Sequence, residues 1–531
     1  MLQTPLFEPN IFATLVRNIS FYLNDGYWGY VFSGIMLLVL AQLLWLKPRP
    51  GLNISELSFP RETFSFSRKS RSDIGALCFF LLCFGIGTAV LYSLDMTLFN
   101  NFDLMNVGTT VTFEEGKGTG ISDIRFSPLA NVELNLFYAV SRHLAVVTAF
   151  TLAETALLLF LLYRLFAFIP VPARLVALGI VMLSPSFLWL NNPVYPERLM
   201  LLFICGSFLA LRKYFETSLA RHFFLFVVLL NLALYTKETV ILFYTGFLAA
   251  AVLCLIYAGK LVPVSFLHPV ATARKFPAEF MMFFSMLVFA LVYLLFGVGF
   301  ADNEYIVSHS IHDAWKNYWL EFLLWILAAV CLAAAKKKNI FMAGLLTGSL
   351  VVLAAISWWL KIANGLYASY YAVIAAVFSI MILAYACRRP SAGIMLAVLV
   401  LCFSGYQNIK IYRMQNGAYY RQTAEFLSEH KFGSRTVHLY VKDSVNGLYE
   451  GYVADCYRSA YKYYFPAQHL VFKTGAKDSD RTGDLLKHTL IYQAEPQPGD
   501  VYIENRFHSR PHPENYRLIY ENRLFRVFDI D

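Results

Sequence analysis

Charged residues are scarce in this chain of 531 residues, at 15% of the sequence, whereas hydrophobic residues make up 58% and aromatic residues 17%. A soluble fold of this size does not need so much apolar surface to build its core, so the excess must face lipid. The first residues also lack the basic region, short apolar core and cleavage site of a signal peptide. We therefore expect the first spans themselves to direct membrane insertion.

Cysteine is rare as well, and its spacing is irregular. Seven of the eight cysteines fall in apolar runs, and only Cys456 stands elsewhere, so neither a disulfide framework nor a metal framework is predicted. The net charge of +9 does not by itself indicate a nucleic-acid partner, because in a membrane protein the placement of Lys and Arg matters more than their sum. There is no internal repeat and no low-complexity tract.

Long apolar runs recur before position 411. About 20 apolar residues cross a hydrocarbon core of about 30 Å, and the sequence supplies about twelve such runs. The predicted spans are residues 28–46, 74–94, 144–166, 175–190, 198–211, 222–236, 239–258, 278–300, 318–335, 340–358, 367–386 and 391–410. The predicted fold class is a polytopic α-helical membrane protein.

Lys and Arg are unevenly divided between the two sides of these spans. Alternating the loops places nineteen of them on one side and eight on the other, leaving out the tail after residue 410. The positive-inside rule makes the richer side cytoplasmic. Both termini and the tail are then predicted to lie outside the cytoplasm.

Three regions follow from these spans. Residues 1–73 hold an extra span and a basic cytoplasmic loop, residues 74–410 form the main transmembrane domain with a long outside loop at 95–143, and residues 411–531 form a small extracytoplasmic α/β domain. In this last region alternating apolar residues predict strands, and 516–520 with 524–528 predict a closing hairpin. The other predicted elements are strands at 436–441, 469–473, 489–493 and 500–504 and helices near 415–430 and 445–462.

Two aspartates, Asp95 and Asp103, begin the long outside loop just beyond a span. A carboxylate at that depth is positioned to act on a substrate held in lipid. Asp95 also suits the N-cap of a following helix, because aspartate is a favoured capping residue. Both interpretations remain open.

Charged residues also appear further along this loop and in two short outside turns. Arg125 and Glu133 lie in an amphipathic segment that we expect at the membrane interface, where they either serve the site or are simply solvated. The turn Asn192-Pro-Val-Tyr195-Pro-Glu197-Arg198 and the turn Tyr235-Thr-Lys237-Glu238-Thr239 each offer an acid beside a cation. Arg198 and Lys237 are candidate phosphate ligands, the first through a bidentate fork and the second as a point charge. The structural alternative is that they only extend to water at the helix ends.

Other polar residues carry weaker signals. Glu154 lies inside a predicted span, so it should face a partner or a cavity. His309, His312 and Asp313 have metal-capable side chains, but three residues in a loop do not define a metal site. The aromatic residues after the tenth span, including Tyr370, suit either an interfacial belt or contact with a sugar or a lipid chain.

This layout and these motifs resemble the GT-C superfamily of membrane glycosyltransferases, which includes protein O-mannosyltransferases and the lipid A aminoarabinose transferases. The features that carry the resemblance are the acidic outside loop, Arg125-Phe-Ser-Pro-Leu with Glu133, the turns at 195–198 and 236–239, and the outside C-terminal domain. The likeness covers residues 74 to about 300 best and 300–410 more loosely. No contiguous acidic pair follows the second span, which leaves both Asp95 and Asp103 as candidates.

The resemblance implies an integral membrane enzyme that uses a polyprenyl-phosphate sugar donor, with Asp95 or Asp103 as the base. Arg198, Lys237 and Arg125 would hold the donor phosphate. We assign Glu133, Glu197, Glu238, Tyr195 and Tyr370 to substrate binding. A divalent metal serves some relatives, but with cations available at the surface none is inferred here, and no other cofactor is expected.

The predicted function is therefore transfer of a sugar from a lipid-linked donor to a glycan, lipid or protein acceptor outside the cytoplasm, in a bacterial cytoplasmic membrane. A base that takes the acceptor proton during attack on the anomeric carbon would invert its configuration. Two rival functions are a transporter or flippase of lipid-linked saccharides, expected to show internal symmetry and charges at the midplane, and a polysaccharide polymerase or ligase.

Overall fold

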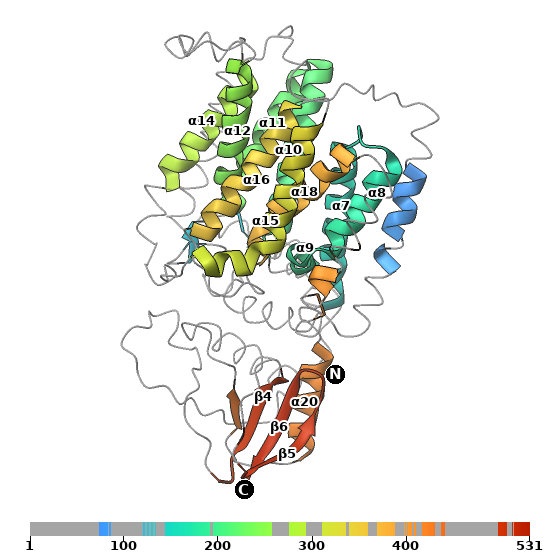
Figure 1. Ribbon diagram of the computed structural model, residues 1–531, viewed down its shortest axis with the longest axis vertical. Coiled ribbons are helices and arrows are strands. Elements are labelled where there is room, and N and C mark those ends of the chain that lie inside the picture. The colour runs from blue at the N-terminus through green and yellow to red at the C-terminus, as the bar shows by residue number, and fades with distance from the viewer. Residues whose placement is uncertain are drawn as a thin grey trace, which may run out of the picture. The chain divides into compact units, whose positions relative to one another are not determined.

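The computed structural model describes parts of the chain, and all structural statements below concern those parts (Figure 1). They are residues 74–86 without 83, short pieces between 121 and 133, 144–191, 195–257, 276–293, 311–335, 339–358, 369–387, short pieces between 398 and 409, 417–430, 437–440, 498–506 with 512, and 514–531. Within them the protein is mostly helical and carries a small sheet near its C-terminal end. Contacts divide the chain into a larger unit, residues 4–86 with 113–408, and a smaller unit, residues 1–3, 87–112 and 409–531.

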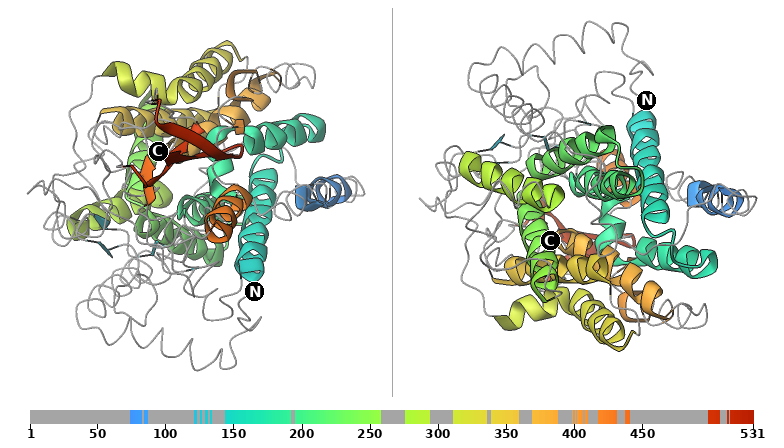
Figure 2. Two further views of the ribbon diagram at one scale, coloured as in Figure 1. Left: turned by 90° about the horizontal axis from the view of Figure 1, so that it is seen from below. Right: turned by 90° about the horizontal axis from the view of Figure 1, so that it is seen from above.

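The larger unit is a bundle of helices, which Figures 1 and 2 show lying side by side. Its principal helices are α7 (Leu144–Leu165), α8 (Val171–Leu183), α10 (Glu197–Thr217), α11 (Ala220–Thr236), α12 (Thr239–Tyr257), α14 (Pro277–Val292), α15 (Ile311–Ala334), α16 (Ile340–Trp358) and α18 (Val373–Cys387). Three short helices join them: α9 (Pro185–Leu188), η1 (Trp189–Asn191) and η6 (Ser369–Ala372). Helix is therefore confirmed in most of the predicted spans from residue 144 to residue 386.

Two of these helices are long and apolar enough to cross a membrane: Thr239–Tyr257 and Ile340–Ser357. They coincide with the predicted spans 239–258 and 340–358. Several other helices in the described ranges are apolar but shorter, among them α8, α11 and α14. The predicted number of twelve spans stays a prediction.

Aromatic side chains bind the centre of this unit together. Phe243 of α12 stacks on Phe378 of α18 with ring centroids 5.2 Å apart, and Phe208 of α10 lies 6.2 Å from Phe243. All three side chains are buried. Burial of such large rings is the main contribution to packing here, and it fixes α10 against α12 and α18.

The smaller unit contains helix α20 (Gly417–Glu429) and a sheet in the order β3-β4-β6-β5. β3 (Val437–Tyr440) runs parallel to β4 (Val501–Asn505), while β4 and β5 (Tyr516–Glu521) both run antiparallel to β6 (Phe525–Ile530). The predicted closing hairpin is confirmed as β5 and β6. The predicted strands at 469–473 and 489–493 and the helix at 445–462 lie outside the described residues.

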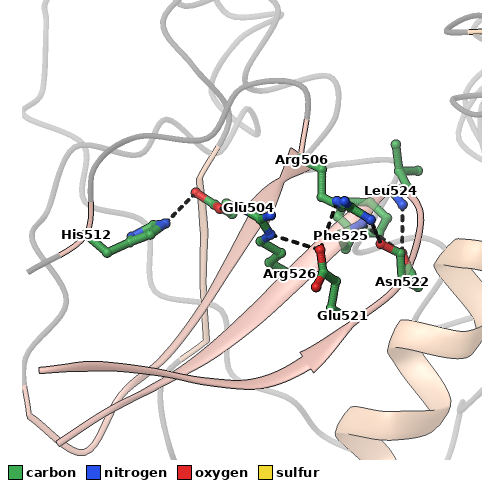
Figure 3. A network of polar contacts seen from close by, with 8 residues as sticks. All are labelled: Glu504, Arg506, His512, Glu521, Asn522, Leu524, Phe525 and Arg526. Atoms are coloured by element: carbon green, nitrogen blue, oxygen red, sulfur yellow. Dashed lines mark hydrogen bonds and ion pairs between the residues drawn. The ribbon is translucent and has the colours of Figure 1, made fainter. Parts of the chain in front are cut away.

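Figure 3 shows a network of polar contacts around the turn between β5 and β6. The Asn522 side-chain oxygen accepts hydrogen bonds from the backbone N–H groups of Leu524 and Phe525 at 2.9 and 2.8 Å. Glu521 lies between Arg506 and Arg526, with N···O distances of 3.0 and 3.1 Å. The Asn522 amide also donates to the carbonyl of Tyr419 in α20 at 3.0 Å. The turn is therefore tied to the helix as well as to its own strands.

Candidate functional site

Arg198 lies in the first turn of α10, which follows the Tyr195-Pro196 step and has Pro196 at its N-cap position. A helix N-terminus carries partial positive charge, so the dipole favours Glu197 there and disfavours the cation of Arg198. The Arg198 side chain is nonetheless fully buried. Its Nε donates to Glu154 Oε2 of α7 at 2.7 Å, and its Nη1 donates to the carbonyl of Leu190 at 2.7 Å. These two acceptors compensate the buried charge.

Lys237 follows the last residue of α11, where the chain adopts an extended conformation before α12 begins. The negative end of the α11 dipole favours a cation at this position. The Lys237 side chain is 5% exposed, and its Nζ lies 2.9 Å from Glu197 Oε1 and 5.0 Å from the centroid of the Tyr371 ring. The two charged turns singled out from the sequence therefore meet through a direct ion pair.

Glu133 adds a third acid to this region. The short piece that carries it is tied to the end of α11, because the Leu129 backbone N–H donates to the Tyr235 carbonyl at 3.0 Å. Glu133 is 6% exposed, and among the residues that the structure describes no other residue forms a hydrogen bond with its carboxylate oxygens. Burial, with the nearby charge of Glu154, raises the pKa of Glu133 to about 8, against an opposing effect of Arg198.

We call Glu133, Glu154, Glu197, Arg198 and Lys237 the buried charge cluster. Its members come from four segments of the helical unit: the piece before α7, α7 itself, the start of α10 and the end of α11. Removing such charges from water costs several kcal/mol per ion unless each is paired. Charge retained at this cost in an apolar helical protein is a mark of a functional site.

A second polar contact lies in the same unit, and the sequence did not point to it. Glu321 of α15 is buried and accepts a hydrogen bond from the Ser186 hydroxyl of α9. The electrostatic neighbours of Tyr318 include both Glu321 and Tyr371, which links this contact to the side chain beside Lys237. An acid within an apolar run is the signal that singled out Glu154, and applied to residues 318–335 it would also have singled out Glu321.

The structure brings Glu133, Glu197, Arg198 and Lys237 together, but it does not place every predicted site residue. Tyr195 is half-buried and packs edge-on against Trp189, with ring centroids 5.8 Å apart. Glu238 is half-buried between α11 and α12. Arg125 belongs to β2 (Arg125–Phe126), paired with β1 (Ile121–Ser122), and Tyr370 belongs to η6, but the side chains of both are outside the description. Asp95 and Asp103 lie outside the described residues.

Metal-binding residue types do not gather in the part of the chain that the structure describes, where no group of three or more His, Cys, Asp or Glu side chains suits a metal ion. His309 is outside this part. His312 and Asp313 fall in α15, with side chains that are not described.

Comparison with known proteins gives no match, either to a family model or to a curated protein. The function of the site therefore has to be argued from its own residues.

Proposed function

We propose that this chain is a multi-pass membrane glycosyltransferase of the GT-C type, in a bacterial cytoplasmic membrane, with its active site and C-terminal domain outside the cytoplasm. It takes a sugar from a polyprenyl-phosphate donor and transfers it to a glycan, lipid or protein acceptor. The observation that carries this proposal is the buried charge cluster, in which two cations from separate turns, Arg198 and Lys237, each form a buried ion pair.

The cations of the cluster suit a phosphate group. Among the described residues, the Arg198 guanidinium pairs with the Glu154 carboxylate and the Lys237 ammonium pairs with the Glu197 carboxylate. A donor phosphate would bind by replacing these carboxylates as the partner of the two cations. Fixed cations beside a departing phosphate stabilise the negative charge that develops on it during transfer.

The base in this proposal is Asp95 or Asp103. A carboxylate within hydrogen-bond reach of the acceptor hydroxyl takes its proton as the oxygen attacks the anomeric carbon, and the lipid phosphate leaves as a stable anion. The bond to the acceptor oxygen forms on the face opposite the bond that breaks. The configuration at the anomeric carbon is therefore inverted.

The test is incubation of the purified protein in detergent with synthetic polyprenyl-phosphate hexoses and pentoses, in the presence of extracted envelope glycans and lipids. Release of lipid phosphate and labelling of the acceptor are measured. We expect Asn at the base position, Asp95 or Asp103, to slow transfer about 10²- to 10⁴-fold, and Lys237→Gln to weaken it as well. Lys213→Ala, which changes an exposed lysine of α10 outside the cluster, is the matched control and should transfer normally.

Two results would count against this proposal. Transfer from no donor of the panel by the folded parent protein would exclude the reaction, and movement of an intact lipid-linked sugar across proteoliposomes would instead support a flippase. Full activity of both Asp95→Asn and Asp103→Asn would remove the proposed base while leaving the reaction itself standing.

A further inference from the structure

Glu133 is the member of the buried charge cluster that forms no ion pair with another described residue. Its charged neighbours are Glu154 on α7 and Glu197 with Arg198 on α10. Arg198 is engaged by Glu154 at 2.7 Å, and Lys237, at the end of α11, is engaged by Glu197 at 2.9 Å. Within the cluster each cation thus has one acid beside it, and Glu133 is the third acid.

The charge of the cluster therefore depends on Glu133. With all five groups ionised, the three acids and two cations of the cluster together carry one net negative charge. With a proton on Glu133 the cluster is neutral, and the carboxyl group becomes a hydrogen-bond donor. Because no other described residue forms a hydrogen bond with these oxygens, that donor is available to a ligand.

We propose, on the basis of the glycosyltransferase function above, that protonated Glu133 donates a hydrogen bond to the phosphate of the lipid-linked donor, so that the site binds a phosphate anion only together with this proton. Glu133 is then a specificity-determining residue for an anionic ligand. It is distinct from the base, which accepts the proton of the acceptor.

The sign of the pH dependence follows from linkage. The pKa of Glu133 is raised to about 8, so the neutral form, which can donate, prevails below that pH, and the charged form, which repels an anion, prevails above it. Anion affinity is then constant at low pH and falls as pH rises through about 8, approaching tenfold per pH unit. A cationic ligand would give the opposite slope, since the ionised cluster attracts cations.

The probes are two phosphodiesters, each singly charged over the whole range: farnesyl methyl phosphate and dimethyl phosphate. Their affinities for the full-length protein in detergent are measured by calorimetry between pH 6 and pH 9.5. We expect the farnesyl probe to lose more than tenfold in affinity between pH 7.5 and pH 9.5 with the parent protein. We expect Glu133→Gln, which keeps a neutral donor at this position, to bind with an affinity that does not change with pH.

The matched control is Glu216→Gln. Glu216 also pairs with cations, Arg212 and Lys213, but lies at the other end of α10, outside the cluster. This variant should keep the slope of the parent protein. If Glu133→Gln does not fold, proton uptake by the parent protein decides the matter: titrations at pH 9 in two buffers of different ionisation enthalpy should show close to one proton taken up per anion bound.

Three results would overturn the proposal: an affinity that rises with pH, the same slope in Glu133→Gln as in the parent, or no binding of either phosphodiester. If dimethyl phosphate and the farnesyl probe bind equally well and both with proton uptake, the result would support Glu133 as a hydrogen-bond donor to phosphate. It would also show that the site does not distinguish the lipid chain. Binding with this slope but without sugar transfer would refute the glycosyltransferase function and leave the proton-linked anion site standing. Sugar transfer without this pH dependence of anion affinity would support the glycosyltransferase function and refute the role of Glu133.

Discussion

Arg198 shows at the scale of one residue what holds the site together. Its guanidinium is fully buried between Glu154 and the Leu190 carbonyl, so truncating it leaves the Glu154 carboxylate without this cation. We expect Arg198→Ala to lower the free energy of unfolding by about 3–5 kcal/mol, the usual cost of removing one partner of a buried pair. Thermal unfolding in detergent, followed by circular dichroism, measures this loss.

Lys213→Ala is the control for that measurement. The Lys213 side chain is 45% exposed and pairs with Glu216, and an exposed pair contributes at most about 1 kcal/mol. Equal losses in the two variants would contradict the role given to Arg198. A double variant, Arg198→Leu with Glu154→Leu, should recover much of the stability, because it removes both members of the pair together.

The sequence drew attention to the charged residues of the two turns, but not to how they pair. It offered Glu197 beside Arg198 and Glu238 beside Lys237. In the structure Glu197 pairs with Lys237, and Arg198 pairs with Glu154. Adjacent residues of a helix point about 100° apart, so Glu197 and Arg198 cannot face the same partner. Pairing between distant segments depends on how the helices pack, which no local pattern contains.

At the scale of the helices, α12 and α16 meet through glycine. A Cβ added to Gly246 of α12 would lie 2.8 Å from both the Gly348 Cα and the Thr347 carbonyl oxygen of α16. Small residues of this kind let two helix backbones approach closely. We expect Gly246→Ala to push the helices apart and to reduce stability by about 1–3 kcal/mol, measured as a lower midpoint of thermal unfolding in detergent.

Gly179 of α8 offers the matched substitution, because a Cβ there meets nothing within 4 Å. Gly179→Ala should be neutral or stabilising, by up to about 1 kcal/mol, since alanine restricts the unfolded chain more than glycine does. A destabilising effect as large as that of Gly246→Ala would show that the close approach of α12 and α16 is not the cause.

Hydropathy was sufficient to predict α12 and α16 as separate apolar helices long enough to cross a membrane, and alternation was sufficient to predict the β5–β6 hairpin. Their partners were not predictable in this way. The parallel pairing of β3 with β4 joins segments that are about 60 residues apart, and a period of two residues fixes only which face of a strand is buried. Likewise, a helix that is apolar on all sides has no single apolar face from which its packing partner could be predicted.

At the scale of the whole molecule, the proposed orientation rests on nineteen Lys and Arg residues in one set of loops against eight in the other. It places Lys213, at the end of α10, in the cytoplasm and Arg517, on β5, outside. Both side chains are well exposed, at 45% and 62%. In a variant with all eight cysteines replaced by serine or alanine, single cysteines at these positions should therefore report opposite sides of the membrane.

We expect a membrane-impermeant maleimide to label Arg517→Cys in intact spheroplasts and to label Lys213→Cys only after the membrane is opened. The cysteine-free parent protein, which should not be labelled in either state, controls for background. Labelling of Lys213→Cys but not Arg517→Cys in intact spheroplasts would invert the orientation and place the buried charge cluster at the cytoplasmic face. Labelling of both would show that residues 213 and 517 lie on the same side of the membrane. The chain would then cross the membrane an even number of times between them, whereas the predicted spans give an odd number.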